Sequence, residues 1–130
     1  VPNLIRVYFT GGFDWLVPVF GPGLIIFKSD FTKLEQVPIP GASATTSPRI
    51  KVPNSDIIDA FEALKDGSSV SFKRITTAVD AGFVFADDTY NMQSFRRKTS
   101  AVINGRRILQ DNNNSTSDFE KIALPTPKGF

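Results

Sequence analysis

The chemistry open to this chain is limited first by two residue types that it lacks. The 130-residue sequence has no histidine and no cysteine, so a general base at neutral pH would have to be Asp, Glu, Lys or Tyr with a shifted pKa. Two acidic groups stand out, Asp87-Asp88 and Asp118 with Glu120. Asp87-Asp88 follows an expected strand, where a site carboxylate can lie, but turns and helix N-caps also place Asp there for local hydrogen bonding. We favour the turn interpretation.

Loops that bind phosphate or calcium have recognisable patterns, and we find none of them. The segment Gly21-Pro22-Gly23 lacks the third glycine and the following helix of a dinucleotide fingerprint. There is no Gly-Lys-Ser or Gly-Lys-Thr sequence and no aspartate-rich calcium loop. Taken with the missing histidine and cysteine, these patterns predict a non-enzymatic chain with no cofactor and no metal site.

Positive charge is concentrated in one part of the sequence. The basic residues there are Lys73, Arg74, Arg96, Arg97, Lys98, Arg106 and Arg107. Phe72 and Phe95 adjoin two of these groups, and a basic surface bordered by aromatic rings suits single-stranded nucleic acid. A solvated sheet face explains the same charges, and strand alternation would send Phe72 and Lys73 to opposite faces. Nucleic-acid binding is therefore the alternative function.

Two proline-rich segments are typical of chains that contact a partner. Residues 37–48 form an uncharged loop that is long for a compact domain. Residues 123–130, stiffened by prolines, are expected to extend as a C-terminal arm. The residues expected to contact a partner are Val37, Pro38, Ile39, Pro40, Leu124, Pro125 and Phe130. By analogy alone, small β-rich cores with such arms resemble subunits that assemble, such as virion components.

Short apolar runs separated by glycine and proline predict that these residues are carried mostly on strands. The Asn104-Gly105 pair predicts a type I′ turn that joins strands at residues 100–103 and 106–109. Residues 111–117 read as a polar linker. The other expected strands lie at residues 4–9, 13–20, 24–27, 49–52, 69–79 and 83–85.

One helix is expected, at residues 56–66. Ile57, Phe61 and Leu64 would form a single apolar stripe on it. Asn54-Ser55 would cap its beginning, and Gly67 is a natural residue to follow its end.

The sequence as a whole predicts one β-dominated α+β domain at residues 1–122, followed by the arm at residues 123–130. The sheet is expected to be mostly antiparallel, or a small barrel or sandwich, with the helix at residues 56–66. No apolar run reaches the ~20 residues of a membrane span, and the lack of cysteine leaves the redox compartment open. The expected function is a non-enzymatic structural or assembly subunit of a virus particle or other large complex, with protein partners or self-association.

Overall fold

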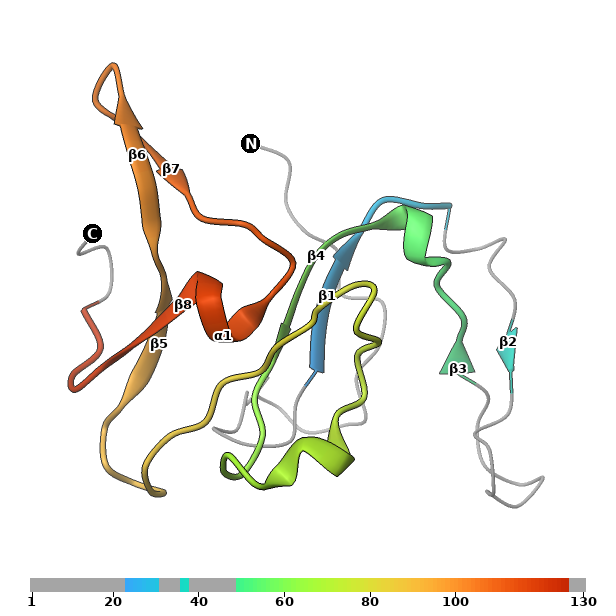
Figure 1. Cartoon of the computed structure of the whole chain (residues 1–130). Coiled ribbons are helices and arrows are strands. Elements are labelled where there is room, and N and C mark those ends of the chain that lie inside the picture. Colours follow the sequence, from blue (N-terminus) through green and yellow to red (C-terminus); the bar gives the residue numbers. More distant parts are fainter. Residues whose placement is uncertain (1–22, 31–35, 38–48, 127–130) are drawn as a thin grey trace, which may run out of the picture.

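Short strands make up most of the regular structure in the computed structural model, which describes residues 23–30, 36–37 and 49–126 (Figure 1). Among these described residues, one α-helix, α1, spans Ser115–Asp118, and two short 3-10 helices span Asn54–Asp56 and Ser69–Phe72. The strands are β1 (Gly23–Phe27), β2 (Gln36–Val37), β3 (Arg49–Ile50), β4 (Ile57–Glu62), β5 (Ser94–Arg97), β6 (Thr99–Ile103), β7 (Arg106–Leu109) and β8 (Phe119–Ile122).

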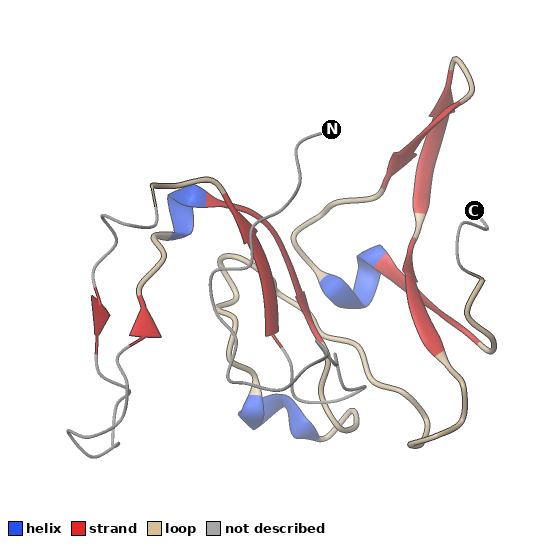
Figure 2. Cartoon of the chain, turned by 180° about the vertical axis from the view of Figure 1, so that it is seen from behind, coloured by secondary structure: helices blue, strands red, loops and turns tan. Residues whose placement is uncertain are grey.

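The strands pair in antiparallel fashion, which confirms the predicted β-dominated antiparallel fold. Within the described residues the pairs are β1 with β4, β2 with β3, β5 with β8 and β6 with β7, and they do not close into a barrel. Figure 2 shows the β2–β3, β1–β4 and β5–β8 ribbons lying side by side, with β6–β7 continuing beyond β5–β8, and loops making most of the connections. Narrow two-stranded ribbons leave much of their backbone edge and side-chain surface uncovered.

β5 and β6 act as one long strand whose two partners lie along the same edge. The Lys98 N–H donates to the Asp118 carbonyl and the Lys98 carbonyl accepts from the Gln110 N–H, each at 2.8 Å. Because the N–H and C=O of one strand residue point to the same side, β8 and β7 flank β5 and β6 on a common edge. No described strand pairs with the opposite edge.

A small apolar core lies at the end of β4 and in the segment that follows it. Its buried members are Ala63, Leu64, Val79, Val84 and Ala86. A cluster of three rings adds to it: the Phe61 ring lies 4.7 Å from that of Phe119 and 6.2 Å from that of Phe95, measured between centroids. Since Phe61 belongs to β4 and the other two to β8 and β5, the cluster fixes β4 against the β5–β8 pair.

The helix predicted at residues 56–66 is wrong. β4 occupies this segment and pairs with β1 from Gly23 opposite Glu62 to Phe27 opposite Ile57. The i, i+4 spacing of Ile57 and Phe61 fits a strand as well as a helix, because four is also a multiple of the strand period. β-Branched and aromatic side chains favour the strand, and the expected cap forms only the 3-10 turn at Asn54–Asp56.

The strand predicted at residues 69–79 is also wrong. The Asp66 carboxylate accepts hydrogen bonds from the Ser68 N–H at 2.9 Å and from the hydroxyls of Ser68 and Ser69. This closes a turn that leads into the 3-10 helix at Ser69–Phe72, since such side chains compete with regular backbone pairing. Of the strand predicted at residues 83–85, only an isolated bridge between Val84 and Ala63 is present.

The hairpin predicted around Asn104-Gly105 is confirmed. Both residues have positive φ, 51° and 76°, as a type I′ turn requires. The polar segment at residues 111–117 is more than a linker, because it contains most of α1. The predicted strands at residues 4–9 and 13–20, most of the proline-rich loop and Phe130 lie outside the described residues. β8 ends at Ile122, and residues 123–126 after it are exposed.

Candidate functional site

The β6–β7 hairpin projects beyond the rest of the described chain, as both views show (Figures 1 and 2). Every residue of the two strands is exposed. Four of its large apolar side chains keep 38–61% of their surface in solvent: Val102, Ile103, Ile108 and Leu109. Exposed apolar side chains that are concentrated on one projecting element indicate an interaction surface, whereas single apolar residues scattered over a surface do not.

Cross-strand pairing sorts these side chains between the two faces of the hairpin. Ala101 lies opposite Ile108 and Ile103 lies opposite Arg106, and directly opposed residues share a face. We call Ala101, Ile103 and Ile108 the apolar hairpin face, with Arg106 at its outer end. An isolated two-stranded hairpin is only marginally stable in water, so a surface that covers this face would stabilise it.

A groove of about 360 Å³ lies beside the hairpin, where β5, β6, β7 and β8 meet. We call it the basic groove; the residues that line it are Arg96, Lys98, Thr99, Arg107, Gln110 and Glu120. The Arg96 Nε and Nη2 atoms both donate to the Glu120 Oε1 atom, at 2.9 and 2.6 Å. Lys98 instead donates to the neutral Ser117 carbonyl at 2.7 Å. Positive charge therefore outweighs negative charge in the groove.

The basic residues predicted to form one patch are divided among different environments. Arg97 lies on the other side of β5 from Arg96, bonded to both Asp59 carboxylate oxygens at 2.6 and 2.7 Å, with its guanidinium 4.6 Å from the centre of the Phe119 ring. Lys73 is bonded to the buried Glu62 carboxylate at 2.8 Å. Phe72, the aromatic residue beside Lys73, is exposed. These structural pairs use charge that a continuous nucleic-acid surface would need.

The rest of the predicted basic set is divided between the basic groove and other exposed positions. Arg96, Lys98 and Arg107 line the basic groove. Arg74 and Arg106 are exposed side chains outside it. The structure thus brings together only part of the set that the sequence predicted.

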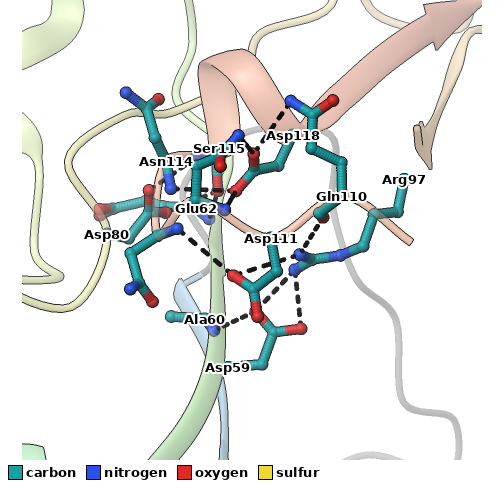
Figure 3. Close-up of polar contacts among 12 residues, drawn as sticks. Asp59, Ala60, Glu62, Asp80, Arg97, Gln110, Asp111, Asn114, Ser115 and Asp118 are labelled. Carbon is teal, nitrogen blue, oxygen red and sulfur yellow. Dashed lines mark hydrogen bonds and ion pairs between the residues drawn. The ribbon is translucent and has the colours of Figure 1, made fainter. Parts of the chain in front are cut away.

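A network of buried polar groups joins α1 to the β4 region (Figure 3). Asp80 accepts the Ser115 N–H at 2.7 Å and the Ser115 hydroxyl at 2.6 Å, and each of these two residues is 1% exposed. Arg97 extends the network by binding Asp59 and the Gln110 carbonyl, the latter at 2.8 Å. No buried side-chain nitrogen or oxygen in the described part of the chain lacks a partner. A fully satisfied network of this kind holds elements in place.

Asp118 terminates this network with a carboxylate that accepts several hydrogen bonds. They come from the backbone N–H groups of Asn112 at 2.8 Å and Asn114 at 3.1 Å, and from the side chains of Ser117 at 3.0 Å and Gln110 at 3.3 Å. Burial raises the pKa of Asp118, but these hydrogen bonds together outweigh burial and hold the pKa below its ordinary value. The folded state therefore favours the ionised carboxylate.

This lowered pKa makes the protein sensitive to acid. The contribution of ionised Asp118 to stability is complete above its unfolded-state pKa and is lost as the pH falls through the lower folded-state pKa. We expect Asp118→Asn to be less stable near neutral pH and to lose less stability on acidification than the parent chain. Urea denaturation between about pH 6 and about pH 2.5 measures both slopes. Asp88→Asn, in an exposed turn, is the control, and parallel curves for Asp118→Asn and the parent would contradict the assignment.

The acidic pair Asp87-Asp88 lies exposed in a turn, as the local interpretation predicts. Asp87 pairs with Lys121 and accepts the Gln93 amide, and these contacts lower the pKa of Asp87, the Lys121 bond most of all. Asp88 accepts the N–H of the following Thr89 at 2.7 Å. Both carboxylates thus have structural partners, Asp88 in the following residue and Asp87 chiefly in Lys121 of β8, which argues against catalysis at this pair.

The described residues contain no group of three or more acidic side chains placed to hold a metal ion. Among these same residues there is also no helix with the length and hydropathy of a membrane span.

The predicted partner-contact residues are only partly within view. Leu124 is 57% exposed and Pro125 is exposed as well. The side chains of Val37, Pro38, Ile39, Pro40 and Phe130 lie outside what the structure describes. Sequence reasoning missed the apolar hairpin face, although the apolar residues flanking the Asn104-Gly105 turn were the available signal.

The chain is similar to one protein family and to a solved structure. A family model described as "Protein of unknown function (DUF4876)" matches residues 1–126. The crystal structure of a DUF4876 family protein from Bacteroides thetaiotaomicron VPI-5482 is similar, with a TM-score of 0.68 and 25% sequence identity over 88% of this chain. The match covers 34% of that protein, so the chain spans about a third of its length. No curated protein matches the chain.

Proposed function

Since the chain belongs to the DUF4876 family, whose description assigns no activity, we propose from its own residues that it is a non-enzymatic interaction module. It contacts another protein through the apolar hairpin face. The observation that supports this proposal most directly is the exposure of Ile103, 58% of whose surface is in solvent on a projecting hairpin. Fully burying a side chain of this size contributes roughly 1.5–3 kcal/mol, and covering the exposed part of Ile103 contributes a corresponding share of it.

The chemistry of the hairpin selects the kind of partner. The exposed basic residues Arg106 and Arg107 begin β7 directly after the turn. A second copy of the same hairpin would bring like charges together, whereas a segment with apolar and acidic side chains would match both features. The edge of β6 that β7 does not occupy also leaves backbone groups available for pairing with an added strand. The partner is therefore an extended segment that alternates apolar and acidic residues.

The related structure supports a role as one module of a longer chain. The related crystal structure is of a much longer chain, of which the match covers 34%. Neither the family description nor that related structure points to a virus particle, so the proposal specifies no such setting. Nucleic-acid binding is not favoured either, because Arg97 and Lys73 are paired inside the fold.

A model peptide tests the proposal directly. A labelled peptide of alternating valine and glutamate is expected to bind the chain, and a valine–lysine peptide to bind much more weakly, since Arg106 and Arg107 repel it. We expect Ile103→Asp to reduce binding of the acidic peptide about tenfold, because a charge then occupies the centre of the contact. Fluorescence anisotropy of the labelled peptide gives both affinities.

Ile58 provides a closely matched control. It is 59% exposed against 58% for Ile103, but it belongs to β4, away from the hairpin. Ile58→Asp should leave peptide binding unchanged. Equal loss in the two variants, or equal binding of the acidic and basic peptides, would contradict docking at the hairpin. Self-association of the unmodified chain that Ile103→Asp abolishes would instead identify a second copy as the partner and overturn the partner proposed here.

A further inference from the structure

Lys98 brings to the basic groove a positive charge that its hydrogen bond to a neutral carbonyl does not balance. Lys98 has three N–H donors available in its ammonium group, and its hydrogen bond within the described residues is to the neutral Ser117 carbonyl. The Gln110 amide donates to that same carbonyl at 2.9 Å. The two contacts hold the Lys98 side chain in position beside the groove without neutralising its charge.

Arg96 presents a second group of donors at the same place. Its guanidinium carries five N–H donors in a fixed plane, and its hydrogen bonds within the described residues use Nε and Nη2, both on Glu120. This pair is partly exposed, with 34% of the Arg96 side chain and 42% of the Glu120 side chain in solvent. A surface pair of this kind contributes little to stability and is easily rearranged. Arg96 can therefore turn donors toward a ligand.

We propose that the basic groove binds a small oxyanion that carries more than one negative charge, such as a phosphate, a sulfate or a polycarboxylate. Arg96, Lys98 and Arg107 meet there against the single carboxylate Glu120. Glu120 already offers one negative charge to Arg96, so a ligand with a single charge would bind Arg96 no better than Glu120 does. A multiply charged oxyanion interacts with the other cations as well. The volume of about 360 Å³ accommodates a ligand of this size.

Titration of the whole chain with inorganic phosphate and with citrate tests this site. Chloride at the same ionic strength measures simple screening. Backbone amide shifts at Lys98, Thr99 and Arg107 are expected to saturate with phosphate or citrate and not with chloride. Whichever of phosphate and citrate binds more tightly then distinguishes a phosphate-type ligand from a polycarboxylate. Lys98→Gln is expected to weaken binding about tenfold, which corresponds to about one charge-assisted hydrogen bond.

Arg106→Gln is the matched control, because Arg106 is the neighbour of Arg107 on β7, is exposed, and does not line the groove. It should change affinity no more than about twofold, the size of a screened long-range effect. Arg107→Gln, at an exposed strand position, tests the site again if Lys98→Gln fails to fold.

The proposal is overturned if phosphate and citrate give only the amide shifts that chloride gives. It is also overturned if Lys98→Gln or Arg107→Gln binds these anions as tightly as the parent chain, or if the chain binds oligonucleotides but neither small anion. The two proposed contacts share Arg107, but their failures are distinguishable, because Ile103→Asp tests only the peptide contact and Lys98→Gln tests only the oxyanion contact.

Discussion

Glu62→Gln is expected to lower the free energy of unfolding by about 3–5 kcal/mol, the range for removing one partner of a buried ion pair. The Glu62 carboxylate is almost fully buried and accepts three donors: the Lys73 ammonium at 2.8 Å, the Arg74 N–H at 2.6 Å and the Ile75 N–H at 3.1 Å. Glutamine keeps the shape but replaces one acceptor oxygen with a donor. One of the three donors would then face another donor, and Lys73 would stay largely buried without its counter-charge.

The expected loss is measured as a shift in the guanidinium chloride midpoint at constant slope. Glu120→Gln is the control, because its ion pair with Arg96 lies near the surface and should contribute at most about 1 kcal/mol. A double replacement, Glu62→Leu with Lys73→Met, should recover part of the loss, since both charges disappear together. Equal midpoints for Glu62→Gln and Glu120→Gln would show that the buried pair does not hold the segment after β4.

Glu62 also shows what sequence patterns can and cannot reveal. Local patterns predicted the strand at β1 and the hairpin around Asn104-Gly105, since a turn is specified by neighbouring residues. The segment containing Glu62 was assigned to a helix because its apolar spacing fits both periods. What decides between them is pairing with β1, a contact between residues far apart in the chain.

The same distinction applies to the candidate sites. Basic residues 96–98 and 106–107 were identified from the sequence, but their division between the basic groove and internal ion pairs depends on which face each side chain takes. The Asp80–Ser115 pair, separated by 35 residues, carries no local signature at all. Residues 111–117 read as a linker for that reason, although the Asn114 side chain caps α1 by accepting from the Thr116 and Ser117 N–H groups. A cap is visible in sequence only when a longer helix follows it.

Gly82→Ala is expected to destabilise the protein by about 3 kcal/mol, by combining overpacking with loss of a helix cap. A Cβ atom at Gly82 would lie 2.0 Å from Asn114 Oδ1 and 2.6 Å from both the backbone nitrogen and the hydroxyl oxygen of Thr116. Thr116 also binds the residue after Gly82: its hydroxyl donates to the Phe83 carbonyl at 2.8 Å and accepts the Phe83 N–H at 3.1 Å. The added methyl group would therefore push the beginning of α1 away from Gly82.

A second glycine variant separates the effect of the close contact at Gly82 from the general effect of replacing glycine with alanine. Gly67→Ala is the control, since a Cβ there would lie 3.4 Å from the Phe85 ring, an ordinary contact. It should be neutral or stabilising by up to about 1 kcal/mol, because alanine restricts the unfolded chain. Hydrogen exchange at the Asp118 amide, which donates to the Asn114 carbonyl at 2.9 Å, should accelerate in Gly82→Ala alone. Unchanged protection at that amide, or equal midpoints for the two variants, would mean that α1 is not held at this point by the absence of a side chain.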